Sequence, residues 1–302
     1  MAKKSKSNNN NTDEKVVLSD YSERKINWYP GHMNRAINEI INGLKKVDIV
    51  LEVRDARSPL VTGNRVLKKK IGNKPKLIVI NKKNLANPDI VEKWEAWFEK
   101  QGEPFIFINC LDKDSLKTLT DKALQILNEK RDSPKKSRMK LMIIGLPNTG
   151  KSTIINKLAN RNATKAAAKP GQTQTQLWVR VGEDLDLLDT PGVMPPEIDT
   201  EEQGIWLSAI HAIPDKVVIP EIPACYIVEH MIKVKSEAFK NHYKLETLGP
   251  DLISTLNAIA ELRGCFRKQN EYDYERVYQL ILNDFRKGDL GKTSFGLPPL
   301  NY

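Results

Sequence analysis

The sequence predicts an α/β fold, in which a doubly wound, mostly parallel six-stranded sheet is followed by a smaller, mostly helical domain. Six short apolar runs lie between residues 47 and 189, and stretches with helical periodicity separate most of them. Such alternation is typical of a parallel sheet with helices on both faces. A glycine-rich loop of the form G-x-x-x-x-G-K-S stands between the fourth run and a helix, which is the usual context of a phosphate-binding loop.

The first four runs are apolar rather than alternating, apart from Asp48 and Glu52 in the first, as expected for strands that helices cover on both faces. In chain order, the six runs are Val47–Val53, Leu77–Ile80, Phe105–Ile108, Leu141–Ile144, Leu177–Val181 and Leu185–Leu188. The clearest helical stretches between them are Asp89–Lys100, Ser115–Glu129 and a run that begins at Lys151. Gly182-Glu183-Asp184 joins the last two strands, which predicts an antiparallel hairpin at one edge of the sheet.

Beyond about residue 204 the pattern becomes helical, for example in Asp251–Leu262 and Tyr274–Phe285. Ala224–Val228 is the one further stretch with strand character. The polar amino terminus is too poor in apolar residues to offset its ordering entropy. We therefore expect a disordered tail (1–25), an α/β domain (26–204) and a smaller helical domain (205–302).

Composition restricts the setting in which the protein works. The chain has 302 residues and no apolar run near the roughly 20 residues that span a bilayer. No apolar stretch follows its basic amino terminus, which argues against a secretory signal. Its 3 cysteines lack metal-ligand spacing, so we expect small buried side chains in a reducing compartment. We predict a cytoplasmic protein without membrane contact, and a monomer by default.

The net charge of +10 favours a polyanionic partner such as RNA. Basic clusters include Lys68-Lys69-Lys70 and the stretch around Lys135-Lys136. A solvated basic surface without a partner explains the same composition. Charge alone leaves both interpretations open.

The glycine-rich loop spans residues 145–152, Gly-Leu-Pro-Asn-Thr-Gly-Lys-Ser. Glycines let successive N–H groups face one concavity, and the helix N-terminus adds partial positive charge. We expect Lys151 to reach the β- and γ-phosphates of a nucleotide and Ser152 to bind Mg²⁺. A chance glycine-rich turn is the alternative, but it does not explain the strand before the loop and the helix after it.

Asp189-Thr190-Pro191-Gly192 ends the strand that we expect beside the phosphate-loop strand. We expect the aspartate to hold Mg²⁺ through water and the Gly192 N–H to reach the γ-phosphate. Between the two motifs, Thr173 follows a Pro-Gly turn and is our candidate for the threonine that completes the Mg²⁺ shell. Thr175 is the rival for that role.

Asn81-Lys82-Lys83-Asn84 follows the second strand and resembles the N-K-x-D element with which GTPases recognise guanine. In that element the asparagine bonds the purine, the lysine packs along the base, and the aspartate accepts from two guanine N–H groups. Asn109-Cys110-Leu111 follows the next strand, where GTPases usually have a Ser-Ala turn near the guanine O6. Both elements precede the phosphate loop, whereas in ordinary GTPases they follow it.

This order of motifs is the pattern of circularly permuted GTPases. Within that class the chain closely resembles the ribosome biogenesis GTPase A family, from Trp28 to about Gly296. Besides the motifs above, the resemblance rests on Trp28-Tyr29-Pro30-Gly31-His32-Met33, Asp55-Ala56-Arg57-Ser58-Pro59-Leu60, Asp284-Phe285-Arg286-Lys287-Gly288 and Leu290-Gly291. It implies a GTPase that acts as a switch in late maturation of the large ribosomal subunit, binds ribosomal RNA through both domains, and hydrolyses GTP to GDP and phosphate.

Position 84 departs from the family pattern, because it is Asn rather than Asp. An amide has one acceptor and one donor group, so it cannot accept from both guanine N–H groups. The mismatch is expected to cost about 1–3 kcal/mol, or roughly one to two decades in affinity. We therefore expect weaker or less selective GTP binding, and the amide donor would suit a base with a carbonyl at that place, such as xanthine.

Hydrolysis needs a group that orients water, and Val193 cannot supply it where Ras-like enzymes have glutamine. The resemblance assigns this role to His32, and an imidazole is able to orient water. The alternative is a histidine at a helix start that caps the Met33–Leu44 helix or helps to dock on RNA. Asn148 matches the loop asparagine of potassium-stimulated GTPases, which makes K⁺ a candidate accessory ion.

The predicted site combines a catalytic residue, nucleotide-binding residues and metal ligands. The catalytic candidate is His32, and the candidate metal ligands are Ser152, Thr173 and Asp189. The nucleotide-binding candidates are Asn81, Lys82, Lys83, Asn84, Asn109, Cys110, Asn148, Thr149, Gly150, Lys151, Ser152, Thr153 and Gly192. Two other functions stay open: a ribosome-binding scaffold with little turnover, and a P-loop NTPase with relaxed base specificity.

Overall fold

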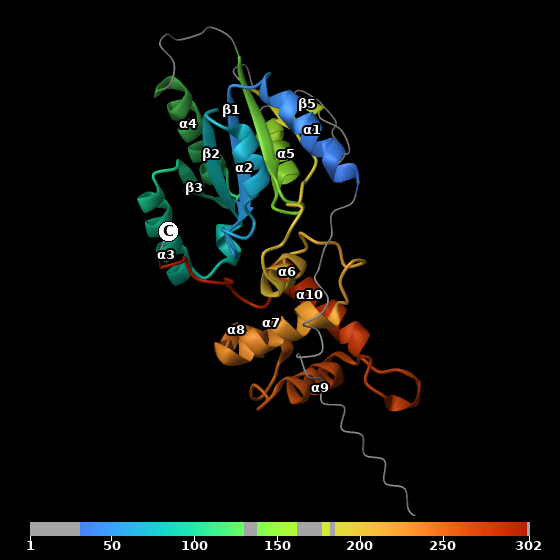
Figure 1. Ribbon diagram of the computed structural model, residues 1–302. Helices are drawn as coiled ribbons and strands as arrows, with labels where there is room; N and C mark the ends of the chain where they lie inside the picture. Colours follow the sequence, from blue (N-terminus) through green and yellow to red (C-terminus); the bar gives the residue numbers. More distant parts are fainter. Residues whose placement is uncertain (1–30, 130–137, 162–176, 182–184, 301–302) are drawn as a thin grey trace, which may run out of the picture.

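The protein has an upper α/β part and a lower helical part in the view of Figure 1. This computed structural model describes residues 31–129, 138–161, 177–181 and 185–300. The predicted tail, the loop that contains Thr173 and the Gly182-Glu183-Asp184 turn lie outside these ranges.

A six-stranded sheet forms the α/β part, with strand order β3-β2-β1-β4-β6-β5. The strands are β1 (Ile49–Asp55), β2 (Lys76–Asn81), β3 (Phe105–Phe107), β4 (Met139–Gly145), β5 (Leu177–Val181) and β6 (Leu185–Asp189). All neighbours pair in parallel except β5 and β6, which are antiparallel. The predicted fold class and the antiparallel edge pair are therefore confirmed.

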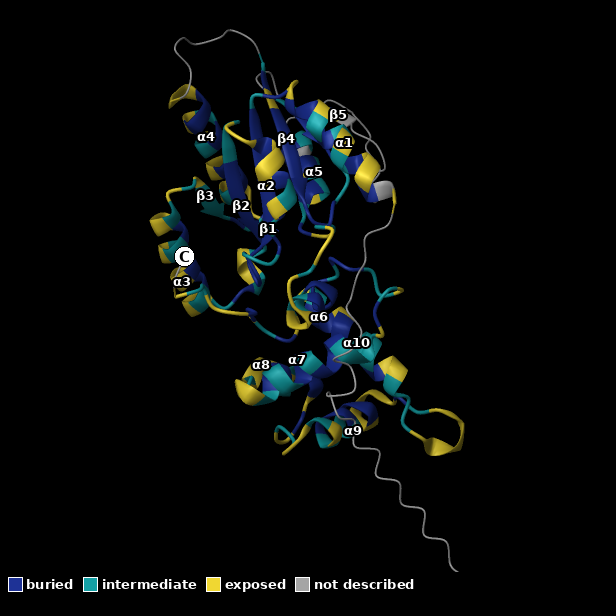
Figure 2. Ribbon diagram, viewed as in Figure 1, coloured by how far each residue is buried: buried dark blue, intermediate teal, exposed yellow. Residues whose placement is uncertain are grey.

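Helices cover both faces of the sheet, and alternate residues of β1 pack toward opposite sides. The helices of this part are α1 (His32–Leu44), α2 (Arg65–Ile71), α3 (Pro88–Gln101), α4 (Lys113–Glu129) and α5 (Lys151–Arg161), with the short 3-10 helix η2 (Lys83–Leu85). Ile49 and Leu51 join the core beneath α4 and α5, whereas Val50 joins the core beneath α1 and α2. Strands β1, β2, β4 and β6 are buried along most of their length, as Figure 2 shows, which explains their largely apolar sequences. The edge strand β3 is half-buried, and the other edge strand, β5, has exposed residues at Trp178 and Arg180.

The helical part has its own apolar core, to which residues of every long helix contribute. Its elements are α6 (Glu201–Ala209), α7 (Glu221–Lys233), α8 (Glu237–Tyr243), α9 (Leu252–Arg263), η3 (Lys268–Asn270) and α10 (Tyr274–Lys287). The expectation of a strand at Ala224–Val228 is wrong, because this stretch lies inside α7. A helix surrounded by other helices is apolar on most sides, so its sequence imitates a buried strand.

The chain end returns from the helical part to the α/β part, and it runs from α10 toward α3 in Figure 1. The Thr293 N–H donates to the Leu85 carbonyl at 2.9 Å, and the Phe295 N–H donates to the Arg57 carbonyl at 2.6 Å. The Ser294 hydroxyl also accepts from the Asn87 N–H at 3.1 Å. The two parts are thus joined at a second place besides the covalent linker.

The cysteines Cys110, Cys225 and Cys265 are buried and free of disulfides, as expected from their spacing. None of the helices in the described ranges combines the length and hydropathy that a bilayer crossing requires.

Candidate functional site

The phosphate loop joins β4 to α5 in a strained conformation that its glycines permit. Gly145 and Gly150 have φ values of 148° and 102°, and Asn148 lies in the left-handed region at 57°. A Cβ on Gly145 would collide with the Val53 carbonyl of β1. The Thr149 hydroxyl donates to the Leu146 carbonyl at 2.9 Å and closes the turn.

Lys151 folds back into this loop. Its Nζ donates to the Leu146 carbonyl at 2.8 Å, and the residue is only 6% exposed. Burial lowers the pKa of Lys151 to about 8, although the nearby charge of Asp189 opposes that shift. A lysine in this state gains both a counter-charge and hydrogen-bond acceptors when a phosphate enters the loop.

The Asp189-Thr190-Pro191-Gly192 segment lies directly beside the loop. Asp189 pairs with Ile143 across the parallel β4–β6 ladder, and the Thr190 hydroxyl donates to the Ile143 carbonyl at 2.6 Å. A Cβ on Gly192 would lie 2.8 Å from the Cα of Pro147, so only glycine lets the segment approach the loop so closely. The carboxyl ends of β4 and β6 therefore present Lys151, Ser152 and Asp189 at one edge of the sheet.

Asn81 ties the predicted base-reading segment to the phosphate loop. This side chain is fully buried, and its Nδ2 donates to the Thr149 carbonyl at 3.0 Å. Its Oδ1 accepts from the Cys110 N–H at 3.0 Å, which adds the segment after β3. A Cβ on Gly150 would collide with the Asn81 amide. The three motifs thus form one continuous site across β3, β2, β1 and β4.

Lys82 makes the second link between these segments. Its backbone is left-handed at φ 63°, and its Nζ donates to the Asn148 carbonyl at 2.6 Å. The same Nζ pairs with Asp55 at 2.9 Å, at the end of β1. Although burial by itself would raise the pKa of Asp55, the charges of Arg57 and Lys82 outweigh it and hold that pKa well below its ordinary value.

Asp55 and Arg57 were absent from the predicted site, although they lie beneath it. Arg57 holds both carboxylate oxygens of Asp55, at 2.9 and 2.8 Å, and its guanidinium packs over the Phe285 ring of α10 at 5.1 Å. The available signal was an aspartate at the carboxyl end of the central strand, next to the predicted base-reading strand. These residues connect the floor of the site with the helical part.

Other predicted residues lie at the rim. Asn84 is exposed in η2, and Lys83 is turned toward α3, where it pairs with Glu95 at 2.9 Å. Asn109 caps its own turn, because its Oδ1 accepts from the Leu111 N–H at 3.1 Å. Thus Lys83 and Asn109 engage local partners in this structure.

Ser152 is half-buried in the first turn of α5, and Thr153 beside it is exposed. His32 begins α1, but its side chain lies outside the described part. Thr173 and its rival Thr175 fall in the segment 162–176, also outside that part.

Two further contacts link the site to its surroundings. The Asn148 Nδ2 donates to the His211 carbonyl after α6 at 2.6 Å. The Asn64 Nδ2, at the start of α2, donates to the Val193 carbonyl at 3.0 Å. Local sequence patterns do not reveal either contact, because each joins residues far apart in the chain.

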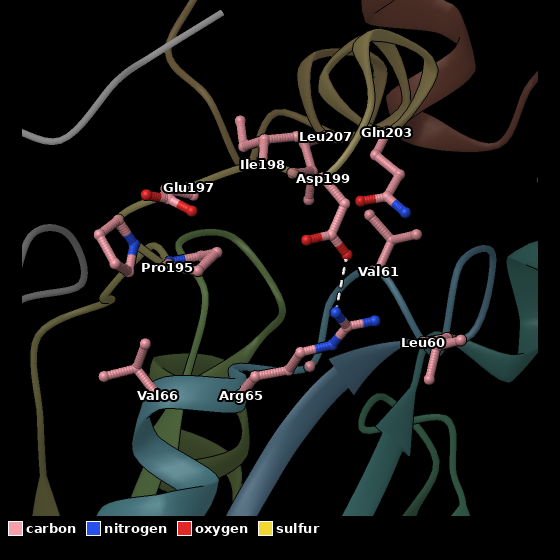
Figure 3. Close-up of a pocket in the computed structure, with 12 residues that line it drawn as sticks. Leu60, Val61, Arg65, Val66, Pro195, Glu197, Ile198, Asp199, Gln203 and Leu207 are labelled. Atoms are coloured by element: carbon pink, nitrogen blue, oxygen red, sulfur yellow. Dashed lines mark ion pairs between the residues drawn. The ribbon is translucent and has the colours of Figure 1, made fainter. Parts of the chain in front are cut away.

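A cavity of about 200 Å³ lies beside the linker that leaves Val193, and Figure 3 shows its lining. Arg65 of α2 pairs there with Asp199 at 3.0 Å. Both side chains are largely exposed, so this pair is a weak connection between the linker and the α/β part.

The parallel sheet, the phosphate loop and the adjoining base-reading segment define a P-loop GTPase. Because the base-reading strand precedes the phosphate loop in the chain, its domain is circularly permuted. Residues 140–253 match a family model described as "50S ribosome-binding GTPase". The chain belongs to the ribosome biogenesis GTPase A family, because a curated relative of that name is 36% identical to it over 90% of its length.

Curated relatives support this assignment over nearly the whole chain. A ribosome biogenesis GTPase A from Bacillus pumilus is 36% identical, with 90% of this chain and 99% of that protein covered. A probable ribosome biogenesis GTPase A from Mycoplasma genitalium is 32% identical, with coverages of 93% and 100%. The GNP-bound crystal structure of YlqF from T. maritima is 26% identical, covers 87% of this chain and 98% of its own, and gives a TM-score of 0.62.

The protein is therefore a guanine-nucleotide-binding GTP hydrolase of ribosome biogenesis. The predicted fold class, family and enzyme class are confirmed by these matches.

Proposed function

We propose that this GTPase is a switch in late assembly of the large ribosomal subunit, and that it binds ribosomal RNA and hydrolyses GTP to GDP and phosphate. One observation carries the proposal: the segments around 81–84 and 145–152 lie side by side, joined by Asn81 and Lys82. This arrangement suits a ligand with a purine at one end and phosphates at the other. The description of the matching family model and the names of the curated relatives support a role at the ribosome.

The phosphates are assigned to the loop, where Thr149, Gly150, Ser152 and Thr153 offer backbone N–H groups and Lys151 its ammonium. The base is assigned to Asn81, Lys82, Lys83 and Asn84, with Asn109 and Cys110 beside it. Both Ser152 and Asp189 carry oxygen ligands of the kind that Mg²⁺ prefers, and Thr173 is the third candidate. When bound there, Mg²⁺ neutralises charge on the phosphate oxygens.

For hydrolysis we assign the water-orienting role to His32. The Val193 side chain is fully buried in the core beneath α1 and α2, and its N–H donates to the Gly145 carbonyl at 3.3 Å. Val193 therefore supplies a backbone contact to the loop and no polar group for water. We further propose that K⁺ binds beside Asn148 and that the protein is a cytoplasmic monomer. The domain limits that we propose are 26–204 and 205–302, and the boundary between residues 204 and 205 falls inside α6.

A second function is favoured by the exposed amide of Asn84 where the family pattern has aspartate. In that function the protein is a nucleotide-gated scaffold with little turnover, or an NTPase with relaxed base specificity. The amide leaves one guanine donor badly paired, which weakens the preference for GTP.

The test is GTP hydrolysis by the purified protein, with and without large ribosomal subunits, for wild type and for His32→Ala. We expect the subunits to stimulate the wild type, and the variant to lose about 10²-fold or more of that stimulated rate. His32→Ala should still bind the subunits. Absence of stimulation in the wild type, with binding intact, would favour the scaffold instead.

A further inference from the structure

A second cavity, of about 540 Å³, lies between α2 and α3, away from the phosphate loop. Its size falls within the range of about 300–1,000 Å³ that is usual for ligand sites. The polar and aromatic residues that line it include Arg54, Lys68, Lys69, Asn73, Trp97 and Gln101. Arg65 lines both this cavity and the one beside the linker, so the two are neighbours.

Arg54 is a fixed part of the cavity wall, and Glu52 balances its charge. The Arg54 side chain is 7% exposed and pairs with the buried Glu52 at 2.8 Å. Its Nη1 donates to the Pro59 carbonyl at 3.3 Å, and its guanidinium lies 6.0 Å from the Phe98 ring centroid. A Cβ on Gly63 would lie 2.7 Å from the Arg54 Cζ, so glycine leaves room for the guanidinium.

Lysines of α2 make the rim strongly positive. Lys68, Lys69 and Lys70 occupy the last turn of that helix, and all three are exposed. Glu103 is the one acid in the lining, and it already pairs with Lys68 and Lys76, at 2.9 and 3.0 Å. Within the described ranges Lys69 forms no ion pair, so its charge is available to a polyanion.

Trp97 supplies an aromatic wall. It is half-buried, and it meets Trp94 and Phe98 in edge-to-face contacts, with ring centroids 5.6 and 5.0 Å away. These contacts hold the indole in one orientation at the edge of the cavity. Aromatic rings and arginine planes are the surfaces on which proteins stack unpaired RNA bases.

We propose that this pocket binds one unstacked nucleotide of a single-stranded ribosomal RNA segment. Its base lies against Trp97 and Arg54, while the flanking phosphates lie near Lys68 and Lys69. The proposal rests on the RNA-binding function proposed above and names the surface that performs it. An acidic protein segment fits less well, because it would leave the aromatic wall and the depth of the cavity unused.

The test uses the full chain, loaded with GDP, and a short fluorescent single-stranded RNA that carries a photoreactive 4-thiouridine. We expect cross-links to peptides that contain Trp97 or Lys69. Trp97→Leu and Lys69→Glu should each weaken binding about tenfold, measured by fluorescence anisotropy. The matched control is Lys117→Glu on α4, an exposed lysine on the opposite face of the sheet, which should change binding less than twofold.

Lys69→Glu alters an exposed residue, so it remains informative if Trp97→Leu fails to fold. Cross-links found only in residues 205–300, or equal binding by all variants, would overturn the proposal. Equal competition by a free mononucleotide or by an acidic phosphopeptide would do the same. If the pocket variants bind RNA normally while ribosomal subunits still stimulate wild-type hydrolysis, this inference fails and the proposed function stands.

Discussion

Single buried polar side chains hold the nucleotide motifs in register. Asn81 bonds simultaneously to the Thr149 carbonyl and the Cys110 N–H, so an amide, with both donor and acceptor, is suited to this position. Replacing Asn81 with Asp would remove the donor and place a carboxylate against the Thr149 carbonyl. The first residue of the base-reading motif is therefore also a structural link between β2 and the phosphate loop.

Asn84 provides a prediction about base choice. Asn84→Asp restores an acceptor pair for guanine, so GTP affinity should rise by roughly one to two decades and the preference over XTP should rise with it. Competition of GTP, XTP and ATP against a fluorescent GDP analogue measures this change. Because Asn84 is exposed, the substitution should leave the free energy of unfolding nearly unchanged. An unaltered ratio of GTP to XTP affinity would show that position 84 does not read the base.

Lys151 makes nucleotide binding dependent on pH. Burial lowers its pKa to about 8 in the nucleotide-free protein, and bound phosphates would raise that pKa again. Between about pH 8 and 10 the free protein lacks a proton that the complex retains, so binding takes up a proton and weakens as pH rises. As the pH rises through this range, the free energy of unfolding of the nucleotide-free protein increases. The reason is that Lys151 still carries its proton in the unfolded state after the folded state has lost it.

Calorimetry in two buffers with different ionisation enthalpies measures this uptake. At about pH 8 we expect roughly half a proton per nucleotide. Lys151→Arg is the matched control, since a guanidinium does not titrate there and any residual binding should show less uptake. No uptake by the wild type up to about pH 9 would contradict a lowered pKa.

Among the elements, the start of α2 connects the central strand β1 to Val193, which directly follows the Asp189-Thr190-Pro191-Gly192 segment. The Glu52 carboxylate accepts from the Asn64 N–H at 3.2 Å, and Asn64 in turn caps α2 and donates to the Val193 carbonyl. Glu52 and Arg54 are charged residues in a buried strand, where each depends on the other for a partner. This short helix is thus anchored by polar contacts rather than by a wide apolar face.

Gly63→Ala tests that anchor. The new methyl group would press on the Arg54 guanidinium, which cannot retreat without losing Glu52, so we expect destabilisation of about 1–3 kcal/mol. Chemical denaturation monitored by circular dichroism measures it. Gly31→Ala is the control, because a Cβ there meets nothing within 4 Å. Equal stability of both variants would mean that Arg54 is free to move.

The whole molecule is connected through several contacts near the nucleotide site. Asn148 in the phosphate loop donates to the His211 carbonyl. The Arg57 guanidinium packs over the Phe285 ring, and the Arg57 carbonyl accepts from the Phe295 N–H. The linker from Val193 reaches the first residue of α6, Glu201, eight residues later. A change at the γ-phosphate position therefore has a short route to the helical part.

Hydrogen exchange tests this coupling. We expect residues 195–215 and 285–296 to differ in protection between the complexes with GDP and with a non-hydrolysable GTP analogue. Asn148→Ala removes the bond to His211 and should reduce the difference. Identical exchange in both complexes, with and without ribosomal subunits, would exclude a nucleotide-driven change in the helical part.

Much of the fold could be predicted, because parallel strands covered on both faces leave continuous apolar runs such as Leu141–Ile144. Other elements could not. In α2 only Leu67 and Ile71 are buried, which is too few for a helical period, and α7 is apolar on so many sides that part of it resembled a strand. In the candidate site the phosphate and base motifs were visible, and Asp55 could be noticed as an aspartate at a strand end, whereas Asn64 and His211 carried no local signal of their contacts.

The sequence by itself determined the class of ligand and the permuted order of the motifs, since a phosphate cradle and a base-reading turn depend on a few consecutive residues. Only the tertiary structure decided which distant side chains join these motifs. Lys82 reaches Asp55, Asn64 reaches Val193 and Asn148 reaches His211 because the sheet brings their strand ends to one edge. Such contacts depend on packing between remote segments, and the order of residues along the chain does not encode them locally.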